Sequence, residues 1–192
     1  MKTLSKVIPI VPVKKFIFPN GTYDIVIKGT SYFEQLQDAL LYGKEIGVPY
    51  WFDEDFNVYG CTIKVLSVYQ NHNKGFIRVK VEGLQLFRIT KYSKKYHSHS
   101  LNEADINFLD FKNQKIENKS IMKYFTKITG AEIYDPKAWI KLLELLNWMN
   151  LRPELSIAII SKPTQEEREH LLARIMKFMA ISKSQANISH LN

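Results

Sequence analysis

The first half of the chain places hydrophobic residues at every second position, which is typical of β-strands with one buried face. Residues 60–69 and 76–81 both alternate in this way, and the turn residues between them, His72 to Gly75, predict a hairpin. Shorter runs predict further strands at 8–13, 16–18, 23–27, 84–90 and 104–111. Pro9 and Pro12 have no N–H donor, so they favour an edge position for the first of these strands.

A helix is predicted to interrupt this β-rich region. The residues from Ser31 to Glu34 match a capping box, in which a serine hydroxyl and a glutamate carboxylate each bind a backbone N–H at the start of a helix. Apolar residues then recur at helical spacing up to Leu41, and Gly43 predicts the end of the helix. Earlier in the chain, the residues from Pro19 to Gly21 predict a turn.

The chain changes character near residue 112, and the remainder has the periodicity of helices. Helices are predicted at 119–129, from Asp135-Pro136 to about 149, at 154–161 and from about 165 onwards. A second capping box, from Thr164 to Glu167, opens the last helix. The apolar residues expected on one face of this helix are Leu171, Leu172, Ile175, Phe178 and Met179. The polar residues after Ser182 predict a frayed end.

These patterns predict an α+β protein with a β-rich lobe over residues 1–112 and a helical bundle over 113–192. A chain of 192 residues is long enough to bury a core without help from a metal or a disulfide. Cys61 is the only cysteine, which excludes an internal disulfide. The chain contains no apolar run long enough to span a bilayer and no signal-peptide pattern, so we expect a cytoplasmic location.

The formal net charge of +8 raises the question of a nucleic-acid partner. Lys91, Lys94 and Lys95, with Tyr92 and Tyr96 between them, would form the contact stretch of an RNA-binding module. However, only five of the 27 basic residues are arginine, which is the residue that base readout and bidentate phosphate contacts favour. We therefore keep RNA binding as the alternative function.

The sequence offers little support for catalysis or for a cofactor. None of its eight glycines falls in a phosphate-binding pattern. Cys61 lies in an alternating strand, where a free cysteine acts as a small buried hydrophobe. His97 and His99, with Glu103 or Asp105, offer too few ligands at metal-site spacing to outweigh a polar loop. We therefore predict no catalytic residue, metal or cofactor.

An aromatic cluster is the most suggestive local feature for binding. Tyr50, Trp51 and Phe52 lie close to Phe56 along the chain, beside the acidic triplet 53–55. These four aromatic residues are the candidate peptide-binding site, with aromatic anchors and an acidic rim. The structural alternative is that residues 46–52 form a buried strand followed by an exposed acidic loop.

Several segments, in order, resemble the N-terminal substrate-binding domain of the Lon ATP-dependent proteases and the free-standing bacterial proteins made of that domain. Residues 8–13 resemble the family's Leu-Pro-Leu-x-Pro-Leu, and residues 18–21 its Phe-Pro-Gly, with Asn20 as an extra residue. Residues 81–89 are similar to its Val-x-Gly-x-x-Arg-hydrophobic-Arg-Ile but have Leu86 where arginine is common. Residues 164–172 resemble its helical ending.

The resemblance implies a PUA-like β pseudo-barrel followed by a helical bundle, in agreement with the periodicity. It implies a protein- or peptide-binding module for unfolded or partner protein segments, which would act as an adaptor for a protease or a chaperone. Gly60 and Gly83 would be structural glycines, and Arg88 would stabilise the β lobe. The ATPase and peptidase modules of the full proteases have no counterpart here, so we expect neither ATP hydrolysis nor proteolysis.

Overall fold

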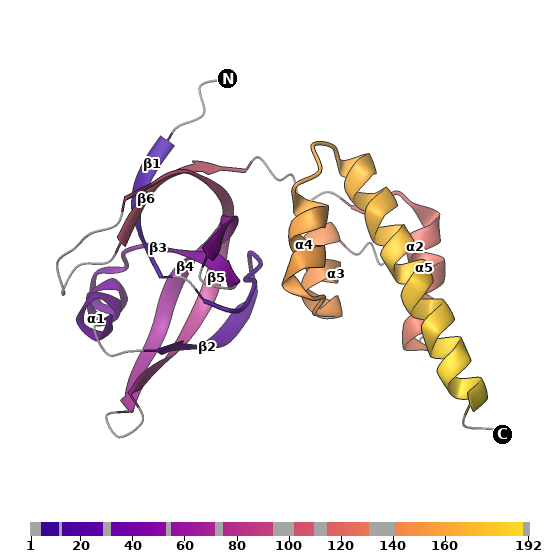
Figure 1. Ribbon diagram of the computed structural model, residues 1–192, viewed down its shortest axis with the longest axis horizontal. Helices are drawn as coiled ribbons and strands as arrows, with labels where there is room; N and C mark the ends of the chain where they lie inside the picture. The colour runs from indigo at the N-terminus through magenta and orange to yellow at the C-terminus, as the bar shows by residue number, and fades with distance from the viewer. Residues whose placement is uncertain are drawn as a thin grey trace. The chain divides into compact units, whose positions relative to one another are not determined.

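The chain forms two compact units, residues 1–111 and 112–192 (Figure 1). The computed structural model describes residues 5–11, 13–28, 32–52, 55–71, 75–93, 102–109, 115–130 and 141–189. Within these ranges, the side chains of residues 5, 28, 51, 52, 55–57, 70, 71 and 184–189 are not described.

The first unit contains strands and the helix predicted between them. Its elements are β1 (Ser5–Ile10), β2 (Thr22–Lys28), α1 (Phe33–Tyr42), β3 (Ile46–Phe52), β4 (Asp55–Asn71), β5 (Phe76–Ser93) and β6 (Asn102–Phe108). The strands form a sheet in the order β2-β5-β4-β3-β1-β6, and an additional pairing of β5 with β6 closes it. The pseudo-barrel curves around its interior in Figure 1.

The long strand β5 makes this closure possible because its two halves have different partners. Residues 76–82 pair with β2, whereas residues 87–93 pair with β6, and β4 lies alongside both halves. The register between β4 and β5 shifts between Cys61 and Ile63, and such irregularities bend a strand. Thr62, at this shift, is buried, and its hydroxyl bonds both the N–H and the carbonyl of Gln85. The bend therefore leaves no buried hydroxyl unsatisfied at this point.

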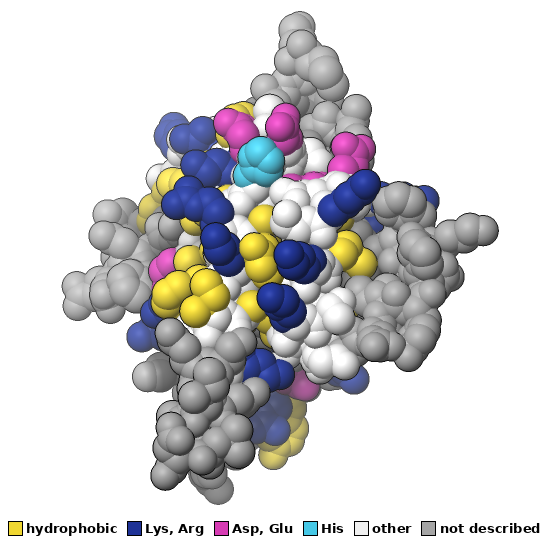
Figure 2. Space-filling view, turned by 90° about the vertical axis from the view of Figure 1, so that its right-hand side faces the viewer, with side chains coloured by type: hydrophobic (Ala, Val, Ile, Leu, Met, Phe, Trp, Pro, Cys, Tyr) yellow, Lys and Arg dark blue, Asp and Glu magenta, His cyan; other side chains and the backbone are white. Residues whose placement is uncertain are grey.

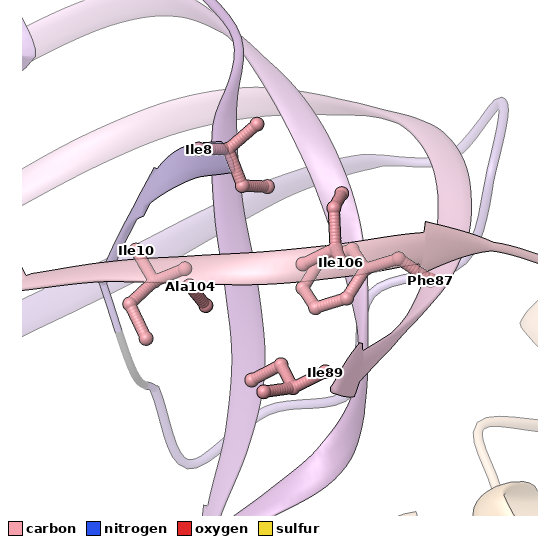
Figure 3. Close-up of a cluster of buried hydrophobic side chains, with 6 residues drawn as sticks. All are labelled: Ile8, Ile10, Phe87, Ile89, Ala104 and Ile106. Atoms are coloured by element: carbon pink, nitrogen blue, oxygen red, sulfur yellow. The ribbon is translucent and has the colours of Figure 1, made fainter. Parts of the chain in front are cut away.

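The barrel core joins strands that are far apart in the sequence. One cluster brings together side chains of β1, β5 and β6, and Figure 3 shows them pointing toward one another. Its members are Ile8, Ile10, Phe87, Ile89, Ala104 and Ile106, each at most 7% exposed. Because the whole of β1 pairs with residues 102–107 of β6, the first strand is held by residues about a hundred positions later.

Two glycines let backbone segments approach each other closely, as the resemblance implied. A Cβ at Gly60 would lie 2.5 Å from the carbonyl oxygen of Val48, and a Cβ at Gly83 would overlap the carbonyl oxygen of Phe18. The turn around Asn20 is tied to Gly83 by two backbone hydrogen bonds, of 2.8 and 2.9 Å. These positions therefore exclude larger side chains.

Three details of the strand prediction are wrong. Residues 16–18 are buried but form no strand. Residues 84–90 are not a separate strand, because β5 continues through Gly83. β1 is not an edge strand, since it pairs with both β3 and β6. The N–H groups of Val11 and Val13 donate to carbonyl groups of β3, so the nitrogen of Pro9, two residues earlier, faces the same side. Pro9 lies just before this pairing begins, and its lack of an N–H donor is therefore tolerated.

The second unit is helical and contains α2 (Lys119–Thr129), α3 (Leu142–Met149), α4 (Pro153–Ile160) and α5 (Gln165–Ser189). The Thr164 hydroxyl accepts from the N–H of Glu167, while the Glu167 carboxylate accepts from the N–H and hydroxyl of Thr164. The predicted capping box is thus confirmed. Helix α5 continues to Ser189, beyond Ser182, where the polar residues predict fraying. The predicted N-caps Ser31 and Asp135 lie outside the described residues, and the N-caps of α1 and α3 are instead Tyr32 and Lys141, so both helices begin later than predicted.

A buried carboxylate joins α5 to the start of α2. Glu169 is 3% exposed and accepts hydrogen bonds from the backbone N–H groups of Glu117 and Asn118 and from the side chain of Gln165. These N–H groups precede the first turn of α2, where a helix favours negative charge. Further along, the Lys183 ammonium donates to the carbonyl oxygen of Ile128 at 2.7 Å. The two contacts fix α5 against both ends of α2.

The predicted α+β class, with a β-barrel lobe followed by helices, is confirmed. Within the described ranges, no helix is both long and apolar enough to cross a bilayer. The 25-residue α5 has the length, but its polar residues exclude it.

Candidate functional site

The predicted aromatic site lies on the hairpin of β3 and β4, where Trp51 is opposite Phe56 in the strand register. Tyr50 is only 8% exposed and belongs to the core. This burial agrees with the buried-strand alternative, and a part for Tyr50 in peptide binding stays a prediction. The side chains of Trp51, Phe52 and Phe56 are outside the described set, so peptide binding by these three stays a prediction.

The residues of the alternative RNA-binding stretch are only partly described. Lys91 and Tyr92 are exposed near the end of β5, where they pair with Asp105 and Ala104 of β6. Lys94, Lys95 and Tyr96 lie beyond the described part of this strand. RNA binding therefore stays an alternative that is neither confirmed nor contradicted.

Cys61 is fully buried, and burial raises the pKa of its thiol to about 12. A thiol with this pKa is protonated at neutral pH and is a poor nucleophile. In the described part of the chain, no group of three or more His, Cys, Asp or Glu residues is placed to hold a metal ion. His97 and His99 are outside that part.

The second unit contains an open apolar groove. It lies between α5 and the segment that joins α3 to α4, and it has a volume of about 670 Å³. This is within the ~300–1,000 Å³ of typical ligand pockets. The apolar side chains that line it are Met149, Leu151, Leu155, Leu171, Ile175, Phe178 and Met179.

The local sequence explains both walls of the groove. Helix α3 is followed by its C-cap Asn150, whose left-handed backbone (φ 45°) turns the chain. Pro153 then begins α4 at a position where a helix has no need of an N–H donor. On the opposite wall, α5 uses a different side for the core, where Leu172 and Met176 are fully buried. Phe178 remains 71% exposed at the groove.

The prediction of one apolar face on α5 therefore needs correction. Leu172 packs inward, whereas Leu171, Ile175, Phe178 and Met179 line the groove. The signal that could have revealed this is the number of apolar residues between 171 and 181, which exceeds what one buried stripe requires. The helical periodicity placed five of them on a single face, and the groove was therefore missed.

The polar residues at the groove are unevenly charged. Arg152 and Arg174 belong to its lining, together with Asn150, and the lining includes no acidic residue. Both arginines are exposed. The groove therefore combines an apolar floor that can exclude water with a positive rim. Such an arrangement can bind an apolar ligand.

Comparisons with known proteins point to one family. The family model described as the ATP-dependent protease La (LON) substrate-binding domain matches residues 7–186. A Lon N-terminal domain protein from Xanthomonas campestris has a similar structure, with a TM-score of 0.60, 15% identity, and coverage of 88% of this chain and 98% of that one. The N-terminal domain of a Mycobacterium avium complex Lon protease gives a TM-score of 0.55, 15% identity, and coverage of 91% and 98%. No curated protein sequence matches the chain.

Proposed function

The chain belongs to the ATP-dependent protease La (LON) substrate-binding domain family, and from this premise we propose that it is a non-catalytic module that binds apolar segments of unfolded or partner proteins. Its role would be to hold such segments for a protease or a chaperone. The identity to the two similar structures is too low to carry more than the fold, so the proposal rests on the family and on the features of this chain.

The open groove of the second unit is the observation that carries the proposal. Seven apolar side chains line it, and Phe178 exposes 71% of its surface. Covering such a surface with a client's leucine or phenylalanine is favourable by about 1.5–3 kcal/mol per fully buried side chain. The lining includes Met149 and Met179 beside Phe178. Because methionine adapts to irregular partners, this lining suits clients of varied shape.

The test measures binding of fluorescently labelled, unfolded casein by fluorescence anisotropy, with Phe178→Asp as the groove variant. The matched control is Leu41→Asp on α1, because Leu41 is 75% exposed and lies in the other unit. We expect Phe178→Asp to weaken binding at least about tenfold, which corresponds to the loss of one buried aromatic contact. Leu41→Asp should leave binding unchanged, and circular dichroism should show both variants folded.

Two further arms separate the alternatives. Trp51→Ala combined with Phe56→Ala tests the aromatic hairpin, and loss of casein binding in this variant alone would move the site there. Labelled single-stranded RNA tests the alternative function, since its binding would weaken steeply with salt whereas apolar binding would hold or strengthen. Equal casein binding by the wild type and Phe178→Asp would overturn the groove as the site.

A further inference from the structure

The groove has an arginine on each of its two walls. Arg152 directly precedes α4, and Arg174 lies on α5. Both side chains are exposed, and neither takes part in an ion pair or a hydrogen bond with any other described residue. Their charges are therefore available to a ligand that lies in the groove.

The distribution of charge along α5 strengthens this asymmetry. Its three glutamates all precede residue 170, whereas Arg174, Lys177 and Lys183 follow. The groove lies beside the second, basic portion of the helix. Figure 2, which faces the right-hand side of Figure 1, shows acidic side chains gathered at its upper end and lysine and arginine side chains interspersed with hydrophobic ones across its middle.

We propose, on the basis of the function proposed above, that the groove selects apolar protein segments that carry acidic residues on both sides of the apolar residues. Arginine forms bidentate hydrogen bonds with carboxylates, and an apolar floor that excludes water strengthens such contacts. A segment flanked by lysine would instead bring like charges together at both walls. The pair Arg152 and Arg174 thus provides selectivity, while the apolar lining provides most of the affinity.

A protein segment fits this site better than a nucleic acid, although both are anionic. Single-stranded nucleic acids bind through aromatic stacking platforms along a basic track. Phe178 is the aromatic side chain of the lining, and the other apolar members are aliphatic or methionine. A bound nucleic acid would leave this aliphatic surface without an apolar partner.

The experiment uses three synthetic peptides of about 15 residues, long enough to form a helix if the groove requires one. They share the same leucine, isoleucine and phenylalanine anchors and differ only in flanking residues, which are glutamate, glutamine or lysine. Each is titrated into the full chain, into the double variant Arg152→Glu with Arg174→Glu, and into Lys177→Glu. Lys177 is exposed on α5 but does not line the groove, so this variant controls for the reversal of a nearby charge outside the groove.

We expect the wild type to bind the glutamate peptide about tenfold more tightly than the lysine peptide, because two exposed ion pairs replace two repulsions. The double variant should reverse this order, and Lys177→Glu should keep it. Equal binding of all three peptides by the wild type, with loss in Phe178→Asp, would overturn the charge selectivity and leave the proposed function intact. Failure of all three peptides and of casein to bind would overturn both proposals. Displacement of a bound peptide by RNA would overturn the preference of the groove for a protein segment.

Discussion

The two units use the same apolar residue types in opposite ways. In the barrel, every second side chain of a strand points into a closed interior. Phe87, Ile106 and Val79 are fully buried there. In the helical unit, α5 buries Leu172 and Met176 on one side and leaves Phe178 exposed at a groove. A closed sheet has one inner face to fill, whereas a helix can carry a second apolar face. Apolar content alone therefore does not separate residues for stability from residues for binding.

The largest expected contrast is between two phenylalanines. Phe87→Ala should lower the free energy of unfolding by about 3–5 kcal/mol, because it removes a fully buried ring and leaves a cavity. Phe178→Ala should change it by less than about 0.5 kcal/mol, since that ring is mostly exposed. Urea unfolding followed by circular dichroism measures both. Equal losses would mean that the groove is part of the folded core.

A second contrast compares one glycine from each unit. Gly83→Ala forces the new Cβ against the backbone of Phe18 and should cost about 3 kcal/mol, because overpacking is joined by strain in two hydrogen bonds. At Gly130 (φ 72°) a Cβ meets open space, so Gly130→Ala should cost only about 1 kcal/mol, from the left-handed backbone. The same urea titration measures the loss of unfolding free energy in both variants. A larger loss at Gly130 would contradict the close approach at Gly83.

The buried thiol predicts a pH dependence that belongs to the barrel. The pKa of Cys61 is raised to about 12 in the folded state, so an unfolded thiol ionises first as the pH rises. The folded state then binds more protons than the unfolded one. Above pH 9 the contribution of the thiol to the free energy of unfolding therefore falls by about 1.4 kcal/mol per pH unit. Cys61→Ala should therefore flatten the decline in unfolding free energy between pH 9 and pH 10. An unchanged slope would show that the thiol does not control it.

The smallest expected effect concerns the start of α5. Thr164→Ala removes the hydroxyl that accepts from the Glu167 N–H and should cost about 1 kcal/mol. The same hydroxyl and the Thr164 N–H hold the pKa of the Glu167 carboxyl below its usual value. Hydrogen exchange of the first α5 amides should become faster in this variant, while barrel amides stay unchanged. Faster exchange in the barrel would show that the two units are coupled.

Local signals in the sequence predicted the local structure well. The bounds of α2 and its end at Gly130 follow from helix periodicity and a residue suited to a left-handed backbone. The capping box at Thr164 and the hairpin between β4 and β5 were also predictable, because their determining residues lie within a few positions of one another. Such features depend on residues that are close together in the sequence rather than on the tertiary fold.

What the sequence missed depends on partners far away in the chain. Phe16 to Phe18 have the apolar character of a strand, but the neighbouring turn is held by Gly83, more than sixty residues later. The inner position of β1 depends on β6 in the same way. The groove was missed because periodicity identifies apolar positions on α5 without showing which of them meet another helix. Exposure of Phe178 is a property of the packed unit, not of its local sequence.

The pairing of β1 with β6 also has a consequence for synthesis on the ribosome. Ser5 lies opposite Asn107, so the first strand cannot find this partner until about a hundred further residues have been made. At ~5–20 residues per second this takes roughly 5–20 s. During that interval Ile8 and Ile10, which end fully buried, have no completed barrel to enter. The nascent chain is thus itself an unfolded apolar segment for several seconds, the same kind of ligand that we propose for the finished protein.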